Sequence, residues 1–167
     1  MENAAKALYI ASGVLIGALI IVLAVTLFSN LQVYVDESRD QIRFNDLNSF
    51  NTKYTNYINS MDDGRTIDFE LKIQDVVTAA NLAYENNLKL NYDAYKNVDP
   101  PESNDNLYVA VYLISTSLGK TRMDGNNDIN KIMQNNLDKT YLCNNSSIEY
   151  NPNSGRVCKV TFKEISR

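Results

Sequence analysis

The stretch LYIASGVLIGALIIVLAVTLF, from Leu8 to Phe28, decides how this chain is organised. No Asp, Glu, Lys or Arg occurs between Lys6 and Asp36. At a rise of about 1.5 Å per residue, a helix of this length reaches about 31 Å, which matches the hydrocarbon layer of a bilayer. Such a helix is apolar on every side, so it has to lie in lipid or in a bundle of similar helices.

The rest of the 167-residue chain is large enough for one domain with its own core and too small for two. We therefore expect an apolar membrane or filament-core helix at 1–30, a stalk and amphipathic continuation at 31–58, and an α+β domain at 59–167. The net charge of −4, without a basic patch, argues against nucleic acid as a partner.

A cleaved signal peptide is the alternative explanation for the apolar stretch. Signal cores usually hold about 7–15 apolar residues after a basic region. Here the apolar run is longer, and the region before it is not basic, because the amino group and Lys6 are its only positive charges and Glu2 offsets one of them. We expect the helix to be retained. The amino group and Lys6 precede the helix, whereas the segment 36–46 that follows it carries more acidic than basic residues. The positive-inside rule then places the N-terminus in the cytoplasm and the domain outside.

Small residues give the apolar helix one distinctive feature, the GxxxG pattern of Gly13 and Gly17. In lipid, small residues let helix backbones approach closely, which favours self-association. The alternative is that Gly and Ala are simply common in membrane helices.

The helix is expected to continue well beyond the apolar part. There is no Pro or Gly between Ser29 and Ile58, and an apolar stripe at steps of three and four begins at Phe44. The polar segment 36–41 reads as a solvated stalk. Gly64 supplies a stop signal, so the helix is expected to span Met1–Ile58.

A second helix is predicted after an N-cap at Thr66, followed by an irregular connector from Leu88 to Asn106. Strand signals cover 107–115, 147–150 and 156–165, with a hairpin loop at 151–155 and a short helix at 126–139. The spacing of the apolar residues in the last strand suggests a bulge or a face change. This order predicts an α+β fold with a small antiparallel sheet packed on the helices.

Two cysteines, Cys143 and Cys158, lie in the soluble part. With no His or further Cys they cannot form a zinc site. Outside the cytoplasm such a pair favours a disulfide that closes a C-terminal loop, which would contribute roughly 3 kcal/mol. The alternative is two unrelated buried thiols.

Catalytic and metal-binding patterns are weak. Ser117 and Lys120 have a serine–lysine spacing but lie in a turn context, and the chain has no His to act as a general base. Asp124, Asn126 and Asp128 alternate like the start of a calcium loop, without the Gly and Glu that complete one. We expect no enzymatic activity and no cofactor, with these three residues as a weak calcium candidate.

Taken together, these parts resemble a type IV pilin or a pilin-like filament subunit. The resemblance lies in the long helix Met1–Ile58, the irregular middle region, the sheet within 107–165 and the Cys143–Cys158 pair. It implies a helical filament of identical subunits on the cell surface, held in the membrane before assembly. Such filaments serve adhesion, motility, DNA uptake, secretion or electron transport.

Pilins also carry a glutamate at the fifth mature position, which neutralises a neighbour's N-terminus. This chain has Ala5 there, and its early acid is Glu2. No leader ending in Gly precedes Met1, so we expect either a processed end or a divergent filament or membrane protein that does not use that pathway. Glu2, Gly13 and Gly17 are the expected assembly residues. The rival hypothesis is a single-span membrane protein whose outer domain binds a ligand or an envelope protein.

Overall fold

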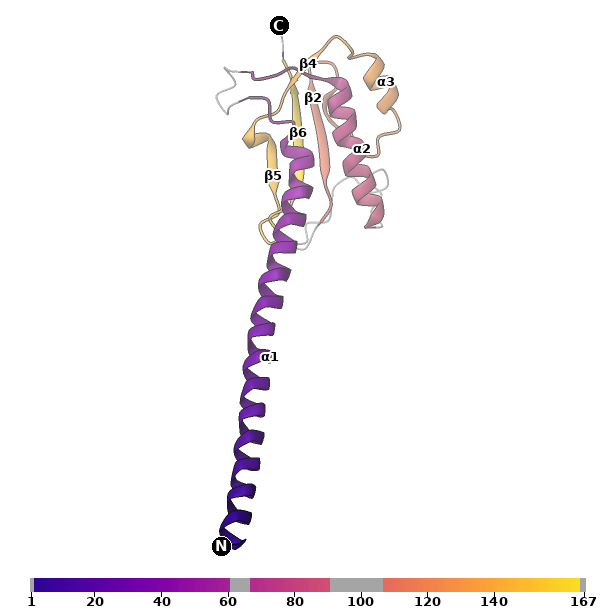
Figure 1. Ribbon diagram of the computed structural model, residues 1–167. Coiled ribbons are helices and arrows are strands. Elements are labelled where there is room, and N and C mark those ends of the chain that lie inside the picture. Colours follow the sequence, from indigo (N-terminus) through magenta and orange to yellow (C-terminus); the bar gives the residue numbers. More distant parts are fainter. Residues whose placement is uncertain (1, 61–66, 91–106, 166–167) are drawn as a thin grey trace. The chain divides into compact units, whose positions relative to one another are not determined.

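The computed structural model describes residues 2–60, 67–90 and 107–165 (Figure 1). The chain divides into two compact units, Met1–Asp46 and Leu47–Arg167, and each is described by itself. The elements in order are α1 (Glu2–Thr55), β1 (Leu71–Lys72), α2 (Ile73–Lys89), β2 (Ala110–Ser115), β3 (Gly119–Arg122), α3 (Ile129–Gln134), β4 (Thr140–Leu142), the 3₁₀ helix η1 (Asn145–Ser147), β5 (Ile148–Tyr150) and β6 (Val157–Glu164). The predicted α+β class is confirmed.

The expected long N-terminal helix is also confirmed, since α1 runs without a break, but it ends at Thr55 instead of Ile58. After Thr55 the backbone tightens, and the Tyr57 and Ile58 amides donate to the carbonyls of Tyr54 and Thr55 at 3.1 and 3.0 Å. Such i to i+3 bonds often close the last turn of a helix. The predicted stop at Gly64 lies outside the described residues.

Asn59 explains why the helix stops early. Its backbone amide donates to the carbonyl of Cys143 at 2.9 Å, and its side-chain oxygen accepts from the Cys143 amide at 2.9 Å. Its side-chain nitrogen donates to the carbonyls of Phe69 and Tyr141, both at 3.0 Å. Asn59 is fully buried, so these bonds fix the chain to the end of β4 where another helical turn would carry it away.

The second helix begins later than the sequence suggested. It starts at Ile73. Phe69 and Leu71 lie before it, and Leu71 belongs to the short strand β1. The Lys72 amide donates to the Asp75 carboxylate at 2.8 Å, which satisfies one free donor at the helix start. Thr66, the predicted cap, lies outside the described residues, as does most of the predicted connector.

The sheet is mixed, so the prediction of a purely antiparallel sheet is wrong. The strand order is β1-β4-β6-β2-β3, and β5 also pairs with β6. β2 and β6 run parallel, with Val111 opposite Val160 and Leu113 opposite Phe162. The remaining pairs are antiparallel. The parallel pair joins strands far apart in sequence, whereas local turn signals reveal only hairpins such as β5–β6.

The core lies between α2, the last turn of α1 and one face of the sheet. Tyr57, just after α1, makes an edge-to-face contact with Phe162 of β6 at 5.8 Å between ring centroids. Tyr54 of α1 and Val76 of α2 belong to the same buried cluster as Phe162. The expected bulge in the last strand is present, because the β5–β6 register shifts beside Glu149 and Tyr150. The buried residues include Tyr54, Leu71, Ile73, Val76, Ala80, Val111, Leu113, Tyr141, Val160 and Phe162.

The predicted disulfide between Cys143 and Cys158 is wrong, since both cysteines are free. Cys143 is fully buried in the core, where burial raises the pKa of its thiol to about 12. Cys158 lies at the bulge, between the buried Val157 and Val160 but outside the core, and its thiol donates to the Glu149 carbonyl at 3.4 Å. The extra residue at the bulge turns Cys158 away from the side that holds Cys143.

Candidate membrane and self-association helix

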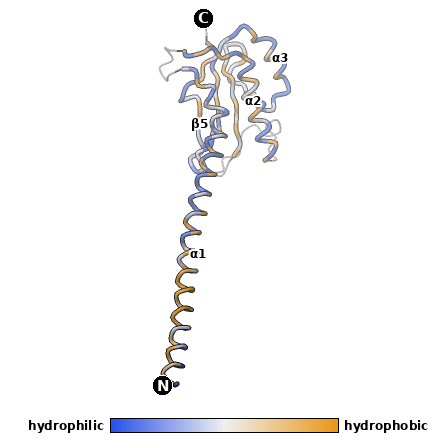
Figure 2. The backbone as a smooth tube through the Cα atoms, in the orientation of Figure 1, coloured by the Kyte–Doolittle hydropathy of each residue, from blue (hydrophilic) through white to orange (hydrophobic). Residues whose placement is uncertain are grey.

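The first half of α1 presents apolar side chains on every side. From Leu8 to Phe28, the large apolar side chains are 55% to 84% exposed. Figure 2 shows this half of α1 as mostly orange, with paler turns between the orange ones. Within the described residues, α1 is the one helix long and apolar enough to cross a membrane, and its apolar window is not buried at all within the chain.

Exposing this helix to water is energetically unfavourable. Burying a single Leu, Ile, Val or Phe side chain is worth about 1.5–3 kcal/mol. Summed over this half of α1, the unrealised stabilisation is on the order of tens of kcal/mol, more than the whole stability of an ordinary domain. The helix therefore needs lipid, detergent or other apolar helices around it.

Gly13 and Gly17 lie one turn apart on α1. A methyl group added at either residue meets no atom of the chain within 4 Å. Their small size is therefore not explained by packing inside the chain. It leaves an open strip of backbone that another helix can approach closely.

Glu2 lies in the first turn of α1 and has a partner in its own chain. The Lys6 ammonium is 3.2 Å from the Glu2 carboxylate, one turn away, and both side chains are largely exposed. An acid near a helix N-terminus is also stabilised by the helix dipole. In an apolar environment the pair would enter as a unit of zero net charge, which is less unfavourable than a lone carboxylate.

The last turns of α1 are fixed to the domain formed by 47–167. The Asn51 side chain donates to the Gly155 carbonyl and accepts from the Val157 amide, both at 2.9 Å. The Arg156 guanidinium lies over the Phe50 ring, 3.7 Å from its centroid. Burial raises the pKa of the neighbouring Tyr54 hydroxyl above its ordinary value. Residues at the end of the helix therefore hold the loop between β5 and β6 in place.

The calcium candidates are engaged in hydrogen bonds within the chain. Asp124 is 2% exposed, and its carboxylate accepts from the Arg122 guanidinium and the Val111 amide. The Asn126 side chain accepts from the Asp128 amide at 2.9 Å and donates to the Arg122 carbonyl at 2.8 Å. Across the described residues, no cluster of three or more His, Cys, Asp or Glu is placed to hold a metal ion.

Asp124 belongs to a buried polar network that sequence analysis did not find. Asn87 of α2 exchanges two hydrogen bonds with the Val109 backbone, at 2.8 and 2.9 Å, and also reaches Asp124 at 3.3 Å. Burial raises the pKa of the Asp124 carboxyl, while its bonds to Arg122 and Val111 act in the opposite direction. The network ties α2 to β2, and its Asn87 and Asp124 side chains are buried. In the sequence, the position of Asn87 near the end of the apolar stripe of the second helix was the only indication of this network.

The serine–lysine pair has no catalytic arrangement. The Lys120 ammonium lies over the Tyr112 ring, 4.5 Å from its centroid, while Ser117 contacts Ser115 and Lys139 at 3.4 and 3.5 Å. Lys120 is therefore directed to Tyr112 on the sheet face.

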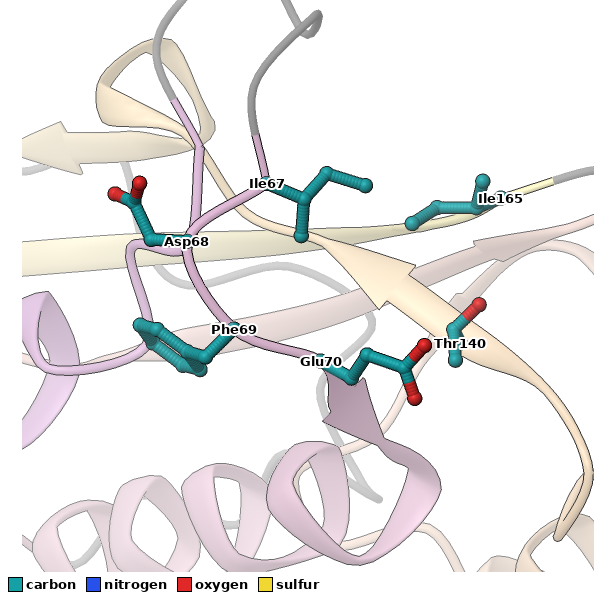
Figure 3. A pocket seen from close by; sticks show the side chains of 6 residues that line it. All are labelled: Ile67, Asp68, Phe69, Glu70, Thr140 and Ile165. Carbon is teal, nitrogen blue, oxygen red and sulfur yellow. The ribbon is translucent and has the colours of Figure 1, made fainter.

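Figure 3 shows a pocket of about 280 Å³ beside β1 and β4. Ile67 and Ile165 approach each other across it, and Glu70 is paired with Lys72 at 2.9 Å. Its lining is apolar and acidic apart from the Thr140 hydroxyl. The lining residues are Ile67, Asp68, Phe69, Glu70, Thr140 and Ile165.

Comparisons of the chain with protein-family models, with curated proteins and with solved structures gave no match.

Proposed function

We propose that this protein is the structural subunit of a pilus-like extracellular filament, assembled through the apolar half of α1. The observation that carries the proposal is the exposure of large apolar side chains around the whole helix from Leu8 to Phe28. Before assembly this half lies in the membrane, with the N-terminus in the cytoplasm and the folded domain outside. In the filament it packs against the same half of other copies.

Transfer from membrane to filament is physically reasonable because both surroundings are apolar. Helix association in lipid depends on close packing and on small residues at the contact. Gly13 and Gly17 offer such a contact, since the chain itself does not fill the space beside them. Glu2 and Lys6 enter as a neutral pair, and a neighbour's amino group can serve as a further partner for Glu2.

The attachment at the end of α1 also suits a load-bearing subunit. A pull on the helix reaches the sheet through Phe50, Asn51 and Tyr54, which contact the β5–β6 loop or the core. A structural subunit needs no catalytic group, and we propose no enzymatic activity.

The experiment is negative-stain microscopy of the full-length protein, together with fractionation of its own cells after shearing. A filament subunit appears as fibres and is abundant in the sheared extracellular material. A single-span binding protein, the rival candidate, stays in the membrane fraction as a monomer or small oligomer. Absence of fibres together with quantitative membrane retention contradicts the proposal.

A pair of double variants tests the contact itself. Gly13→Leu with Gly17→Leu fills the open strip and should abolish or strongly reduce fibre yield while leaving membrane insertion intact. The matched control is Ala11→Leu with Ala18→Leu, two enlargements of small residues that lie away from the glycine strip. Equal fibre yield from both variants would show that the glycine strip is not the contact.

Glu2→Ala tests the role of the early acid. We expect this variant to impair assembly more than membrane insertion, because Lys6 is then left without its partner in an apolar core. Normal fibre yield from Glu2→Ala would remove Glu2 from the assembly residues.

A further inference from the structure

The side of α1 that carries the two glycines continues as an apolar strip beyond the apolar half. An α-helix makes five whole turns in 18 residues, so residues 18 apart share one side. Leu31 lies 18 residues after Gly13, and Val35 lies 18 residues after Gly17. Ile42 follows Val35 by two turns and lies within about 20° of it around the helix. The open strip beside the glycines therefore leads into the strip formed by Leu31, Val35 and Ile42.

This apolar strip is not buried in the folded chain. Leu31, Val35 and Ile42 are 57%, 41% and 57% exposed. The residues of α1 that contribute to the core are Phe50 and Tyr54, nearer to its end. Each large apolar side chain left in water forgoes about 1.5–3 kcal/mol of burial. The strip therefore favours a partner surface that covers it.

The spacing of the strip is that of a two-stranded coiled coil. In each seven-residue repeat of a coiled coil, the side chains at the first and fourth positions, called a and d, face the partner helix. The a positions hold Phe28, Val35 and Ile42, and the d positions hold Leu31 and Ser38. β-branched residues at a with leucine at d favour a parallel pair of helices. The same repeat reaches back to the second glycine of the strip, which occupies a d position.

The structure also has the recess that such a pair needs. A side chain at d inserts into a hole between four residues of the facing helix, spaced i, i+3, i+4 and i+7. An open hollow of about 580 Å³ lies on this side of α1, and four of its residues have this spacing. The side chain that meets it in a parallel pair is Leu31 of the second copy. The lining residues are Phe28, Leu31, Gln32, Val35, Asp36 and Arg39.

The charges of the segment leave the strip clear. Asp36 with Arg39, and Asp40 with Arg43, are opposite charges three residues apart, so they support the helix by themselves. In the same repeat, Asp36, Glu37, Asp40 and Arg43 occupy positions b, c and f, which face away from a partner helix. The acidic side chains of two paired copies therefore point away from each other.

Arg39 lies at the edge of the strip, at position e. In a parallel pair, position e of one helix meets position g of the other, five residues earlier. Position g here holds Tyr34, which is 71% exposed. A guanidinium beside an aromatic ring is a favourable contact. On one helix, residues 34 and 39 lie on different sides, so this contact forms only between copies.

We propose that residues 28–42 of α1 form a parallel two-stranded coiled coil with the same residues of a second copy. The inference rests on the proposed function, because it takes the partner to be another subunit with its N-terminus on the same side of the membrane. Two such helices run parallel and meet residue against residue. Close packing at the glycines holds the pair in lipid, and burial of Leu31, Val35 and Ile42 holds it in water.

Disulfide formation in the full-length protein, reconstituted in lipid vesicles, tests the contact. Ser38→Cys places a thiol at a d position, where the two copies bring residue 38 within the reach of a disulfide. The matched control is Asp40→Cys, two residues later at position f, and both side chains are exposed. Under mild oxidation, Ser38→Cys should give at least about tenfold more disulfide-linked dimer than Asp40→Cys. The unchanged chain measures the background from Cys158, since Cys143 is buried.

Two double variants test the strength of the pairing. Val35→Glu with Ile42→Glu places four carboxylates in the contact of two copies. This variant should raise the dissociation constant of the dimer, measured by sedimentation equilibrium in mild detergent, at least about tenfold. The matched control is Val33→Glu with Phe44→Glu, which makes the same change of charge at positions f and c, where the side chains are 60% and 63% exposed. Its dissociation constant should change by less than about threefold.

The outcomes separate this inference from the function on which it rests. Preferential cross-linking at residue 38, without fibres from the unchanged protein, supports the coiled coil and overturns the filament. Fibres from the unchanged protein together with equal cross-linking at 38 and 40 overturn the coiled coil alone. Equal dissociation constants for the two double variants also overturn it. Circular dichroism identifies any double variant that fails to fold, and the cysteine variants then decide, since each changes one exposed side chain of an unbroken helix.

Discussion

Replacing Asn59 with Ala should destabilise the folded domain more than any other exchange of an asparagine near the end of α1. The side chain makes three hydrogen bonds, to the carbonyls of Phe69 and Tyr141 and from the amide of Cys143. Asn59 is 0% exposed, so water cannot replace these partners without opening the structure.

The expected loss follows from those three bonds. A buried backbone group left without a partner costs roughly 1–3 kcal/mol. Part of the loss is relieved by relaxation, so Asn59→Ala should lower the free energy of unfolding by about 3–5 kcal/mol. This is a large share of the roughly 5–15 kcal/mol that stabilises a typical domain.

The assay is urea unfolding of the full-length protein in detergent, followed by near-ultraviolet circular dichroism. The eleven tyrosines supply the signal, since the chain has no tryptophan. The control is Asn56→Ala, three residues earlier, where the side chain is exposed and the change should stay within about 0.5 kcal/mol. A loss below about 1 kcal/mol for Asn59→Ala would refute the view that Asn59 fixes the end of the helix to β4.

Three further predictions concern the folded domain. The hydrogen bond from Lys139 lowers the pKa of the Glu164 carboxyl. The stability that this pair adds to the fold is therefore fully present above the pKa of an unfolded glutamate, about 4.3, and is lost as the pH falls through the lowered pKa of the folded state. Glu164→Gln should therefore reduce stability at pH 7 by at most about 1 kcal/mol and flatten its decline in acid, and parallel acid unfolding curves would contradict this. In the native protein a thiol reagent should label Cys158 slowly, because burial raises the pKa of its thiol, and should label Cys143 only on unfolding. A reductant should leave the melting temperature unchanged, and a reductant-sensitive melting temperature would contradict the free thiols. Arg156→Lys should cost about 1–2 kcal/mol in urea unfolding, since lysine lacks the planar group that stacks on the aromatic ring beneath it, and an unchanged midpoint would argue against that stacking.

Periodicity and composition were sufficient to predict the α-helices and the strands β2, β5 and β6. The end of α1 was predicted to within three residues. The prediction rested on the charge-free stretch Leu8–Phe28 and on the absence of Pro or Gly from Ser29 to Ile58. The turn residues of 151–155 give the β5–β6 hairpin, where the Asn151 side chain accepts from the amides of Asn153 and Ser154. These are local properties, and local properties can be read from a single sequence.

What the sequence did not reveal depends on contacts between distant residues. The parallel pairing of β2 with β6 has no local turn signal, and β1, β3 and β4 are too short to show alternation. The bulge at Cys158 was suggested by the spacing of Val157 and Val160, but its effect on the thiol was not, which is why the disulfide prediction failed. Buried asparagines such as Asn59 and Asn87 resemble surface residues until their partners are known.

The central claim is that the apolar half of α1 contacts other copies of itself in the functional state, and photo-cross-linking from Ile20 tests it most directly. Ile20 lies in the apolar stretch and is 61% exposed on the isolated chain. A photoreactive residue at this position should give a ladder of cross-linked subunits in sheared extracellular material and lipid adducts in the membrane fraction. Lipid adducts alone, with no subunit ladder in any fraction, would contradict the claim and favour a single-span anchor.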